Sequence, residues 1–220
     1  MNIMQAVLRN DIPAISELLI GGAGVDEPDR GGRTPLMQAA INQRIDIMKL
    51  LLDSGARTDL QDKNGWSVLY FAVQVRSAEG IKLLVSHGPT VDLDQGDKGG
   101  RTPLMQAAIN QRIDIMKLLL DSGAEPDIQD RRRWSALHFA AQEQSADGIE
   151  LLVSHGATID TADNDGNTPL STAVFNYRGN GNAVSALLRL GADRQRKNKH
   201  GVSPAGLAHK IGNYDVRKFF

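Results

Sequence analysis

Two short aspartate-rich segments have the composition of a calcium-binding loop. The first reads DLDQGDKGG, starting at Asp92, and the second reads DNDGN, starting at Asp163. A calcium loop of the helix-loop-helix type needs a bidentate glutamate at its twelfth position, where the first segment has Pro103. Aspartate and glycine are also the residues that tight turns require. We therefore interpret both segments as turns, and the sequence predicts no metal site and no cofactor.

The five histidines are the other candidates for chemistry, as acids, bases or partners of a nucleophile. His87 and His155 take the same position in a repeated segment, near the end of a predicted helix, where a polar or cationic side chain is favoured. His138, His200 and His209 fall in different predicted elements, so no nucleophile, base and orienting residue come together. We expect a protein that is not an enzyme and that has no small-molecule substrate.

Arginine and tryptophan alternate at one recurring position, the residue immediately before a serine or threonine. Along the chain this position holds Arg33, Trp66, Arg101, Trp134, Asn167 and Val202. Tryptophan and arginine are the residue types most enriched at the energetic centres of protein interfaces. Either the two indoles contact a partner, or each covers the hydrocarbon of a neighbouring turn and stacks with an adjacent arginine. The sequence favours the first interpretation and leaves the second open.

Basic side chains recur a few positions earlier in the same segments, against one acid, Asp165. They are Arg30, Lys63, Lys98, Arg131, Arg132 and Lys199. A basic stripe of this kind favours an acidic partner. The local charge is nevertheless mixed, because an aspartate comes at the start of these segments, at Asp29, Asp62, Asp97, Asp130 and Asp163. Such a pattern is also typical of a solvated face.

The elements that carry these residues are duplicated within the chain. The 26 residues Gly31–Ala56 recur letter for letter as Gly99–Ala124, 68 positions later. A looser match continues beyond them, so the duplicated unit is about 31–98 and its copy is 99–166. Internal repetition outweighs every other signal for the fold, because overlooking it leads to the wrong architecture.

Each copy contains two related segments of about 33 residues, a length that two helices and a turn fill. In the first segment, Thr34-Pro35 provides a capping hydroxyl and a proline suited to the first turn of a helix. The small pair Ala39-Ala40 permits close helix packing, and Gly55 is suited to a left-handed helix end. An apolar stripe on the second helix is predicted from Ile45, Met48, Leu51 and Leu52.

The pattern Gly-x-Thr-Pro-Leu, the Ala-Ala pair and Leu-Leu-x-x-x-Gly-Ala resemble the ankyrin repeat, and the resemblance covers essentially the whole chain. The resemblance implies an all-α ankyrin-repeat solenoid of helix-turn-helix units with β-hairpin-like loops. We expect one domain, 1–220, made of an N-terminal cap repeat, five full repeats and a truncated C-terminal cap repeat. Their ranges are 1–28, 29–61, 62–96, 97–129, 130–162, 163–197 and 198–220.

Several positions depart from the family pattern. The residue after Thr-Pro-Leu is usually histidine, but here it is Met37 and Met105, with Tyr70 and His138 at the equivalent positions. We therefore expect a turn hydrogen bond to be lost in several repeats. Arg133 replaces the hairpin glycine. Either the strain of a left-handed non-glycine residue, on the order of 1 kcal/mol, is tolerated there or the turn differs. Two extra residues lie near Leu93–Gly96 and two near Arg178–Gly181, where insertions are expected to form loops.

Composition narrows the possibilities further. The 220 residues carry a formal net charge of -1, which gives no overall attraction to nucleic acid or to an anionic membrane. The absence of cysteine excludes disulfides, a thiol nucleophile and cysteine-ligated zinc. The first residues contain no leading basic segment, and no apolar run is long enough to span a bilayer. We expect a cytoplasmic, monomeric protein that does not bind membranes.

The resemblance implies that the hairpin tips and the inner face of the first helix of each repeat form a concave binding surface. We place these partner-binding candidates on it: Arg30, Arg33, Lys63, Trp66, Lys98, Arg101, Arg131, Arg132, Trp134, Asn167, Phe175 and Tyr177. The sequence favours a non-catalytic protein-protein interaction module that binds another protein with an acidic or mixed-charge surface. Two alternatives stay open: a bacterial toxin-neutralising immunity protein or host-directed effector of ankyrin type and, less favoured, a nucleic-acid-binding protein.

Overall fold

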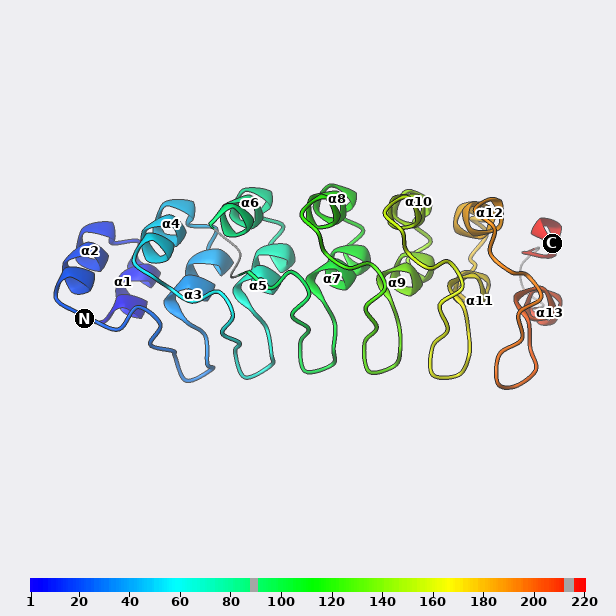
Figure 1. The fold of residues 1–220 in the computed structure, drawn as a ribbon, viewed down its shortest axis with the longest axis horizontal. Coiled ribbons are helices and arrows are strands. Elements are labelled where there is room, and N and C mark those ends of the chain that lie inside the picture. The colour runs from blue at the N-terminus through cyan, green and yellow to red at the C-terminus, as the bar shows by residue number, and fades with distance from the viewer. Residues whose placement is uncertain (88–90, 212–215) are drawn as a thin grey trace. The chain divides into compact units, whose positions relative to one another are not determined.

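Pairs of short helices joined by extended loops build the protein in the computed structural model (Figure 1). The structure describes residues 1–87, 91–211 and 216–220, and these contain thirteen α-helices, one 3-10 helix and no strand. The predicted all-α fold class is confirmed. The chain divides into two units, Met1–Pro103 and Leu104–Phe220. The single domain and the repeat boundaries stay predictions, and the repeats 62–96 and 198–220 each contain residues outside the described ranges.

The first unit contains three pairs of consecutive helices. They are α1 (Ile3–Arg9) with α2 (Ile12–Ile20), α3 (Pro35–Ile41) with α4 (Ile45–Asp53), and α5 (Val68–Gln74) with α6 (Ala78–Ser86). The first helices of the pairs form one layer, in which α3 packs between α1 and α5, while α4 packs against α6 in a second layer. The long loops project from the edge formed by the first layer (Figure 1).

The second unit repeats this arrangement. It contains α8 (Ile113–Asp121), α9 (Ala136–Gln142), α10 (Ala146–Ser154), α11 (Pro169–Phe175), α12 (Asn182–Arg189), α13 (Pro204–Lys210) and the 3-10 helix η1 (Val216–Phe219), whereas α7 (Pro103–Ile109) begins at the last residue of the first unit. One layer holds α9, α11 and α13 in that order, and the other holds α8, α10 and α12. In place of a second long helix, η1 packs against α13.

The ends of the helices follow from the caps that the sequence predicts. Thr34 Oγ1 accepts a hydrogen bond from the Met37 N–H at 3.3 Å, and Pro35 occupies the first turn of α3. Gly55 has a φ of +85° just after α4, as expected for a left-handed helix end. The Thr34 N–H lies 3.4 Å from the Met37 sulfur, so a weak contact replaces the turn hydrogen bond that we expected to be lost.

The apolar stripe predicted on α4 faces the core of the first unit. Met48, Leu51 and Leu52 are buried, and Ile45 is half-buried. Ile47, which the predicted stripe did not include, has no exposed surface and joins the same core. Burying a side chain of this size stabilises the fold by about 1.5 to 3 kcal/mol.

One acidic or amide side chain organises the hairpin loop between consecutive helix pairs. Oδ1 of Asp130 accepts hydrogen bonds from the N–H groups of Arg132 at 2.8 Å and Trp134 at 2.9 Å. The same two bonds are made in the other hairpins by Asp29, Asp62, Asp97, Asp163 and Asn198. These aspartates therefore fix the turn geometry, in agreement with the turn interpretation of the aspartate-rich segments.

A backbone hydrogen bond joins successive hairpins within each unit. In the second unit the Asn164 N–H donates to the Arg132 carbonyl at 3.0 Å, and the Lys199 N–H donates to the Asp165 carbonyl at 2.9 Å. In the first unit the equivalent bonds run from Lys63 to Gly31 and from Lys98 to Asn64. The hairpin tips of one unit are thus held at a fixed spacing.

Arg133 adopts the left-handed conformation of the glycine that it replaces. Its φ is +60°, and its N–H donates to the Asp130 carbonyl at 2.7 Å. The equivalent residues of the other hairpins have φ between +72° and +84°: Gly32, Gly65, Gly100, Gly166 and Gly201. The turn is therefore retained and the strain is tolerated, which decides between the two alternatives left by the sequence.

The inserted loop between α11 and α12 is covered by the C-terminal 3-10 helix. Tyr177 is only 4% exposed, and its ring centroid lies 6.0 Å from that of Phe219. A Cβ atom on Gly181 would overlap with the Phe219 ring, so a larger residue there would displace that ring. Tyr177 is a packing residue and not part of the surface, contrary to its predicted place among the partner-binding candidates.

Candidate binding groove

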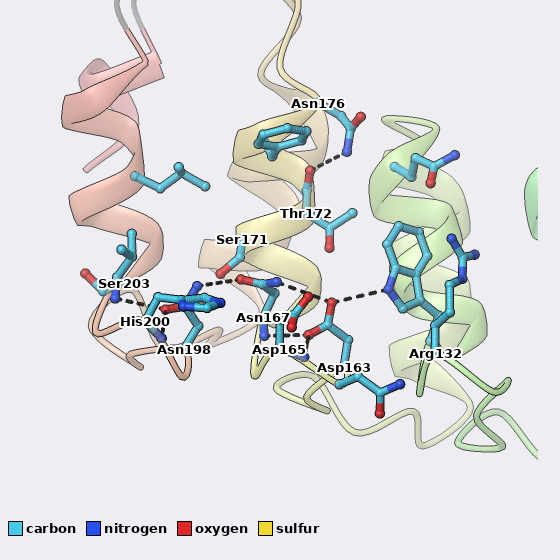
Figure 2. A pocket seen from close by; sticks show the side chains of 16 residues that line it. Arg132, Asp163, Asp165, Asn167, Ser171, Thr172, Asn176, Asn198, His200 and Ser203 are labelled. Atoms are coloured by element: carbon cyan, nitrogen blue, oxygen red, sulfur yellow. Dashed lines mark hydrogen bonds between the residues drawn. The ribbon is translucent and has the colours of Figure 1, made fainter.

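A groove of about 740 Å³ lies in the second unit, lined by three consecutive hairpins and by α9, α11 and α13 (Figure 2). Four of the predicted partner-binding residues line it: Arg132, Trp134, Asn167 and Phe175. We call this cavity the groove. Its volume lies in the range that bound ligands and peptide side chains occupy in protein clefts.

Trp134 forms one wall of the groove and is itself held in place by its neighbours. Its ring centroid lies 5.7 Å from that of His138 and 5.2 Å from that of Phe139. The guanidinium carbon of Arg132 lies 4.4 Å from the centroid of the indole, within cation–π distance. The indole N–H donates to Asp163 Oδ2 at 3.3 Å. The stacking offered as the alternative interpretation is therefore present, and the same half-buried indole also lines the groove.

Asp163 holds the central hairpin of the groove together (Figure 2). Its Oδ1 accepts from the N–H groups of Asp165 at 2.9 Å and Asn167 at 2.8 Å, and its Oδ2 accepts from the Asn167 side-chain amide at 3.3 Å. Asn198 Nδ2 continues the network by donating to Asn167 Oδ1 at 2.8 Å. Because Asp163 is only 8% exposed and accepts on both oxygens, it serves the hairpin rather than a cation or a substrate.

Phe175 is an exposed aromatic side chain on the wall formed by α11. It is 72% exposed, and no other phenylalanine, tyrosine or tryptophan in the described part of the chain falls in the exposed class. Beside it, Asn176 Nδ2 donates to the Thr172 carbonyl at 2.9 Å. The position of Phe175 at the end of α11 corresponds to Gln142 at the end of α9, which also lines the groove. An exposed aromatic ring surrounded by amides is typical of a surface that binds a partner.

His138 supports Trp134 from below and does not reach the groove. It has no exposed surface; its Nδ1 accepts from the Ser135 N–H at 3.2 Å, and its Nε2 lies 3.3 Å from the Asn167 carbonyl oxygen. This arrangement places the proton of the neutral ring on Nε2. Burial lowers the pKa of His138, although the Asn167 carbonyl and the charges of Asp163 and Asp130 act in the opposite direction. The ring is thus a buried packing group.

The first copy has a related aromatic cluster beneath Trp66. The indole stacks on Tyr70 at 5.1 Å between centroids and meets the edge of Phe71 at 5.4 Å. Tyr70 is 2% exposed, and burial together with the negative charge of Asp97 raises its pKa to about 12, against the opposing effect of Arg101. Both tryptophans therefore stack on the residue four positions later, Tyr70 or His138. Trp134 also donates to Asp163 and lines the groove.

The basic residues among the predicted partner-binding candidates differ in exposure, and the half-buried one forms an ion pair with an aspartate of its own hairpin. The exposed ones are Arg30, Lys63, Lys98, Arg101, Arg131 and Arg132. Arg33 is half-buried, and its guanidinium lies 2.9 Å from the Asp29 carboxylate. Partial burial tends to raise the pKa of Asp29, but hydrogen bonds from the backbone of Arg33 and Gly31 and from the guanidinium bring it below its ordinary value. Arg33 therefore stabilises its own hairpin.

The residues considered for chemistry at the outset make structural contacts. Oδ1 of Asp92 accepts from the Asp94 N–H at 2.9 Å, as in a turn. His155 Nε2 lies 3.2 Å from an Asp121 carboxylate oxygen, an arrangement that recurs at 2.9 Å in the first copy, between His87 and Asp53. Within residues 1–87, 91–211 and 216–220, no group of three His, Asp or Glu side chains is placed to hold a metal ion.

The partner-binding candidates predicted from the sequence did not include the residues that the last hairpin and α13 contribute to the groove. His200, Val202 and Leu207 line it there. Val202 occupies the position of Trp134, and Leu207 occupies the position of Phe139. Val202 was already aligned with Trp134 from the sequence, and extending that alignment along the truncated last repeat would have added His200 and Leu207.

The chain belongs to the ankyrin repeat family. The family model for ankyrin repeats in three copies matches residues 3–95, 54–130 and 104–198, which together span most of the chain. The predicted membership is confirmed.

Curated relatives match parts of the chain. Human ankyrin repeat domain-containing protein 63 is 33% identical over 124 residues, covering 52% of this chain and 32% of that protein. Protein PhlB of Serratia liquefaciens is 35% identical over 118 residues, covering 52% of this chain and 51% of that protein. Inversin of Gallus gallus is 39% identical over 77 residues, covering 35% of this chain and 7% of that protein. The chain spans about half the length of these relatives or less.

Solved structures match over the full length. The ankyrin repeat domain of Bcl-3, a member of the IkappaB protein family, is 28% identical with a TM-score of 0.88, covering 100% of this chain and 97% of that one. The human ASB11 ankyrin repeat domain is 22% identical with a TM-score of 0.80, and the match covers 100% of this chain and 96% of that domain. Ankyrin repeats are in general protein-protein interaction modules on a scaffold that is typically non-catalytic. None of the helices described is both long and apolar enough to cross a bilayer.

Proposed function

We propose that the chain binds a partner protein through the groove and the hairpin tips beside it, without catalysing a reaction. The observation that carries the proposal is the 72% exposed ring of Phe175 in a groove of about 740 Å³. An exposed apolar centre with a polar rim is the usual anatomy of a protein interface. The amides of Asn176 and Gln142 supply that rim on the helical side.

The exposed charges at the tips favour a partner with acidic or mixed-charge groups. The aspartates that accompany the basic residues have one carboxylate oxygen committed to backbone N–H groups, as at Asp130 and Asp163. The exposed basic side chains are therefore the charges that a partner meets first on these hairpins, apart from Asp165. A cytoplasmic location and a monomeric state belong to the same proposal and stay predictions.

Phe175→Asp tests the proposal more directly than substitution of the tryptophans, because Phe175 is exposed whereas the indoles are half-buried. A partner is first captured with the intact chain, then purified, and its affinity is measured by calorimetry. We expect Phe175→Asp to weaken binding at least about tenfold, which corresponds to about 1.4 kcal/mol.

The matched control is Ile20→Asp, which places the same charge at an 89% exposed apolar position on α2 of the first unit. The control should leave the affinity unchanged. Equal affinities for both variants and the original chain would show that the groove is not the binding site. An equal loss in both would show that binding depends on overall charge.

A further inference from the structure

Three consecutive arginines form the tip of one hairpin of the second unit. Arg131, Arg132 and Arg133 are all exposed, and we call them the arginine tip. The duplicated segment in the first unit has Lys63, Asn64 and Gly65 at these positions. The arginine tip therefore carries two positive charges more than its counterpart, on the same backbone frame.

The last of these arginines is held against the preference of its backbone. Arg133 has a φ of +60°, where the corresponding residue of every other hairpin between described helix pairs is glycine. An L-residue in this region is less stable than glycine. Other non-glycine residues also adopt a left-handed φ, but Gln43, Arg76, Gln111 and Gln144 lie between the two helices of a pair and not in a hairpin. Arg133 thus distinguishes this hairpin from the others and adds a third guanidinium to the tip.

The middle arginine is oriented by the groove wall. The guanidinium carbon of Arg132 lies 4.4 Å from the Trp134 centroid and 5.6 Å from the Phe139 centroid. Its Nε lies 3.4 Å from Asp130 Oδ2, a long contact. Stacking restricts the planar guanidinium, so less conformational freedom is lost when its remaining N–H groups bind an oxyanion. A guanidinium fork matches carboxylate and phosphate oxygens in pairs.

The excess charge of the tip is local. The aspartate of the same hairpin, Asp130, is 5% exposed and accepts hydrogen bonds from two backbone N–H groups. The three arginines, in contrast, are exposed to solvent. On the next hairpin of the same unit the exposed residues are Asn164 and Asp165, and the only charge among them is negative. A nucleic-acid backbone needs a continuous basic track, because affinity grows with the number of phosphates contacted. One positive tip followed by an acidic one fits a short anionic group of a protein segment better.

We infer that the arginine tip captures an oxyanion-bearing side chain of a partner segment whose remainder lies in the groove. The oxyanion is the carboxylate of an acidic residue or the phosphate of a phosphorylated one, which present the same chemistry to a guanidinium. This inference rests on the proposed function, since it assigns one end of the same binding site. It also makes the two copies unequal, because the first copy lacks this tip.

The test gives the second copy the tip of the first, with the combined substitution Arg131→Lys, Arg132→Asn and Arg133→Gly. The substituted loop has the sequence that forms the hairpin of the first unit, so the fold is retained and the thermal unfolding midpoint verifies this. The probes are fluorescently labelled octapeptides, one of glutamate and one of glutamate containing phosphoserine. We expect the variant to bind both probes at least about tenfold more weakly at low salt.

The matched control removes two positive charges elsewhere, with Lys49→Gln on α4 and Lys82→Gln on α6, both exposed and in the first unit. Retained binding in this control supports the arginine tip. Equal losses in both variants would show a response to net charge and overturn the inference. The ratio of the two peptide affinities identifies the preferred oxyanion, and either preference is consistent with the inference. Tighter binding of a single-stranded DNA of similar charge would overturn it in favour of nucleic acid.

The purified partner separates this inference from the proposed function. If Phe175→Asp abolishes binding of the partner and the tip variant does not, the groove is the binding site and the arginine tip has no part in it. If neither variant changes the affinity for the partner, the proposed function fails as well. Losses in both variants support the two proposals together.

Discussion

The hairpins around Trp66 and Trp134 descend from one duplicated sequence and have kept one backbone frame. In both, an aspartate accepts hydrogen bonds from the N–H groups two and four residues later, within 2.7 to 2.9 Å. The side chains on this frame have diverged, since Asn64 corresponds to Arg132. The comparison shows that the frame depends on one carboxylate and on backbone groups, which leaves the exposed positions free to change.

The two hairpins also differ in how closely the next loop approaches them. A Cβ atom on Gly65 would lie 2.6 Å from the Lys98 nitrogen, whereas its counterpart Arg133 already carries a Cβ atom. The first copy therefore requires glycine for space as well as for conformation, and the second copy does not. The second copy therefore accommodates an arginine at the position where the first copy leaves no room for a Cβ atom.

The largest effect is expected for Gly65→Ala. The substitution combines a left-handed φ of +84° with a close contact to the backbone of the next hairpin. We expect the free energy of unfolding, measured by urea denaturation, to fall by about 3 kcal/mol. Arg133→Ala should change it by less than about 0.5 kcal/mol, because the Cβ atom and the conformation are already accommodated.

Gly55→Ala separates the two contributions at Gly65. Gly55 has a similar φ of +85°, and a Cβ atom there would meet nothing within 4 Å. Its replacement should cost about 1 kcal/mol, the conformational part alone. Equal costs at Gly55 and Gly65 would mean that the close approach of the next hairpin relaxes, and that space does not distinguish the two copies.

A smaller difference is expected between Trp134→Phe and Trp66→Phe. Both substitutions keep an aromatic ring over the ring below, but Trp134→Phe also removes the hydrogen bond from the indole N–H to Asp163 at 3.3 Å. Asp163 keeps its other donors, so its carboxylate is not left unpaired. We expect Trp134→Phe to lower the free energy of unfolding by about 1 kcal/mol more than Trp66→Phe.

Denaturation of the two phenylalanine variants under identical conditions gives this difference directly. A cost that is equal in both copies would show that the bond to Asp163 contributes nothing to stability. The indole of Trp134 would then be held by packing alone, as Trp66 is over Tyr70 and Phe71.

The fold and the hairpin frame could be predicted because they depend on local signals. The cap at Thr34, the helix end at Gly55 and the turn aspartates each act within a few residues of their own position. Periodicity then repeats these local signals along the chain. At Arg133 the sequence predicted the choice between strain and a different turn, but not its outcome, because that depends on the space left by the next hairpin.

The extent of the groove could not be predicted, because it depends on contacts between distant segments. Tyr177 is buried by Phe219, which returns from the end of the chain to lie over Gly181. No local pattern at Tyr177 indicates this contact. Phe175 was predicted at the surface from its position on the first helix of a repeat, and its side chain is 72% exposed, but the hairpin and helix that face it come from other repeats.

The smallest effect on the free energy of unfolding at neutral pH is expected for His138, whose ring stacks on Trp134. This effect grows only in acid. Burial lowers the pKa of His138 below its ordinary value of 6.5, although Asp163 and Asp130 partly oppose this shift and Arg132 adds to it. Below pH 6.5 the unfolded chain therefore takes up a proton at this site that the folded chain does not. The contribution of His138 to stability is complete above pH 6.5 and is lost as the pH falls towards its folded pKa.

His138→Tyr restores the residue of the first copy and removes this dependence, because a buried tyrosine such as Tyr70, with a pKa of about 12, does not titrate in acid. Urea denaturation of both proteins between about pH 5 and 8 isolates the effect, since every other titrating group is shared. We expect the free energy of unfolding of the original chain to fall relative to that of the variant as the pH decreases. Parallel pH profiles would contradict the prediction, because they would mean that His138 takes up its proton equally well in the folded chain.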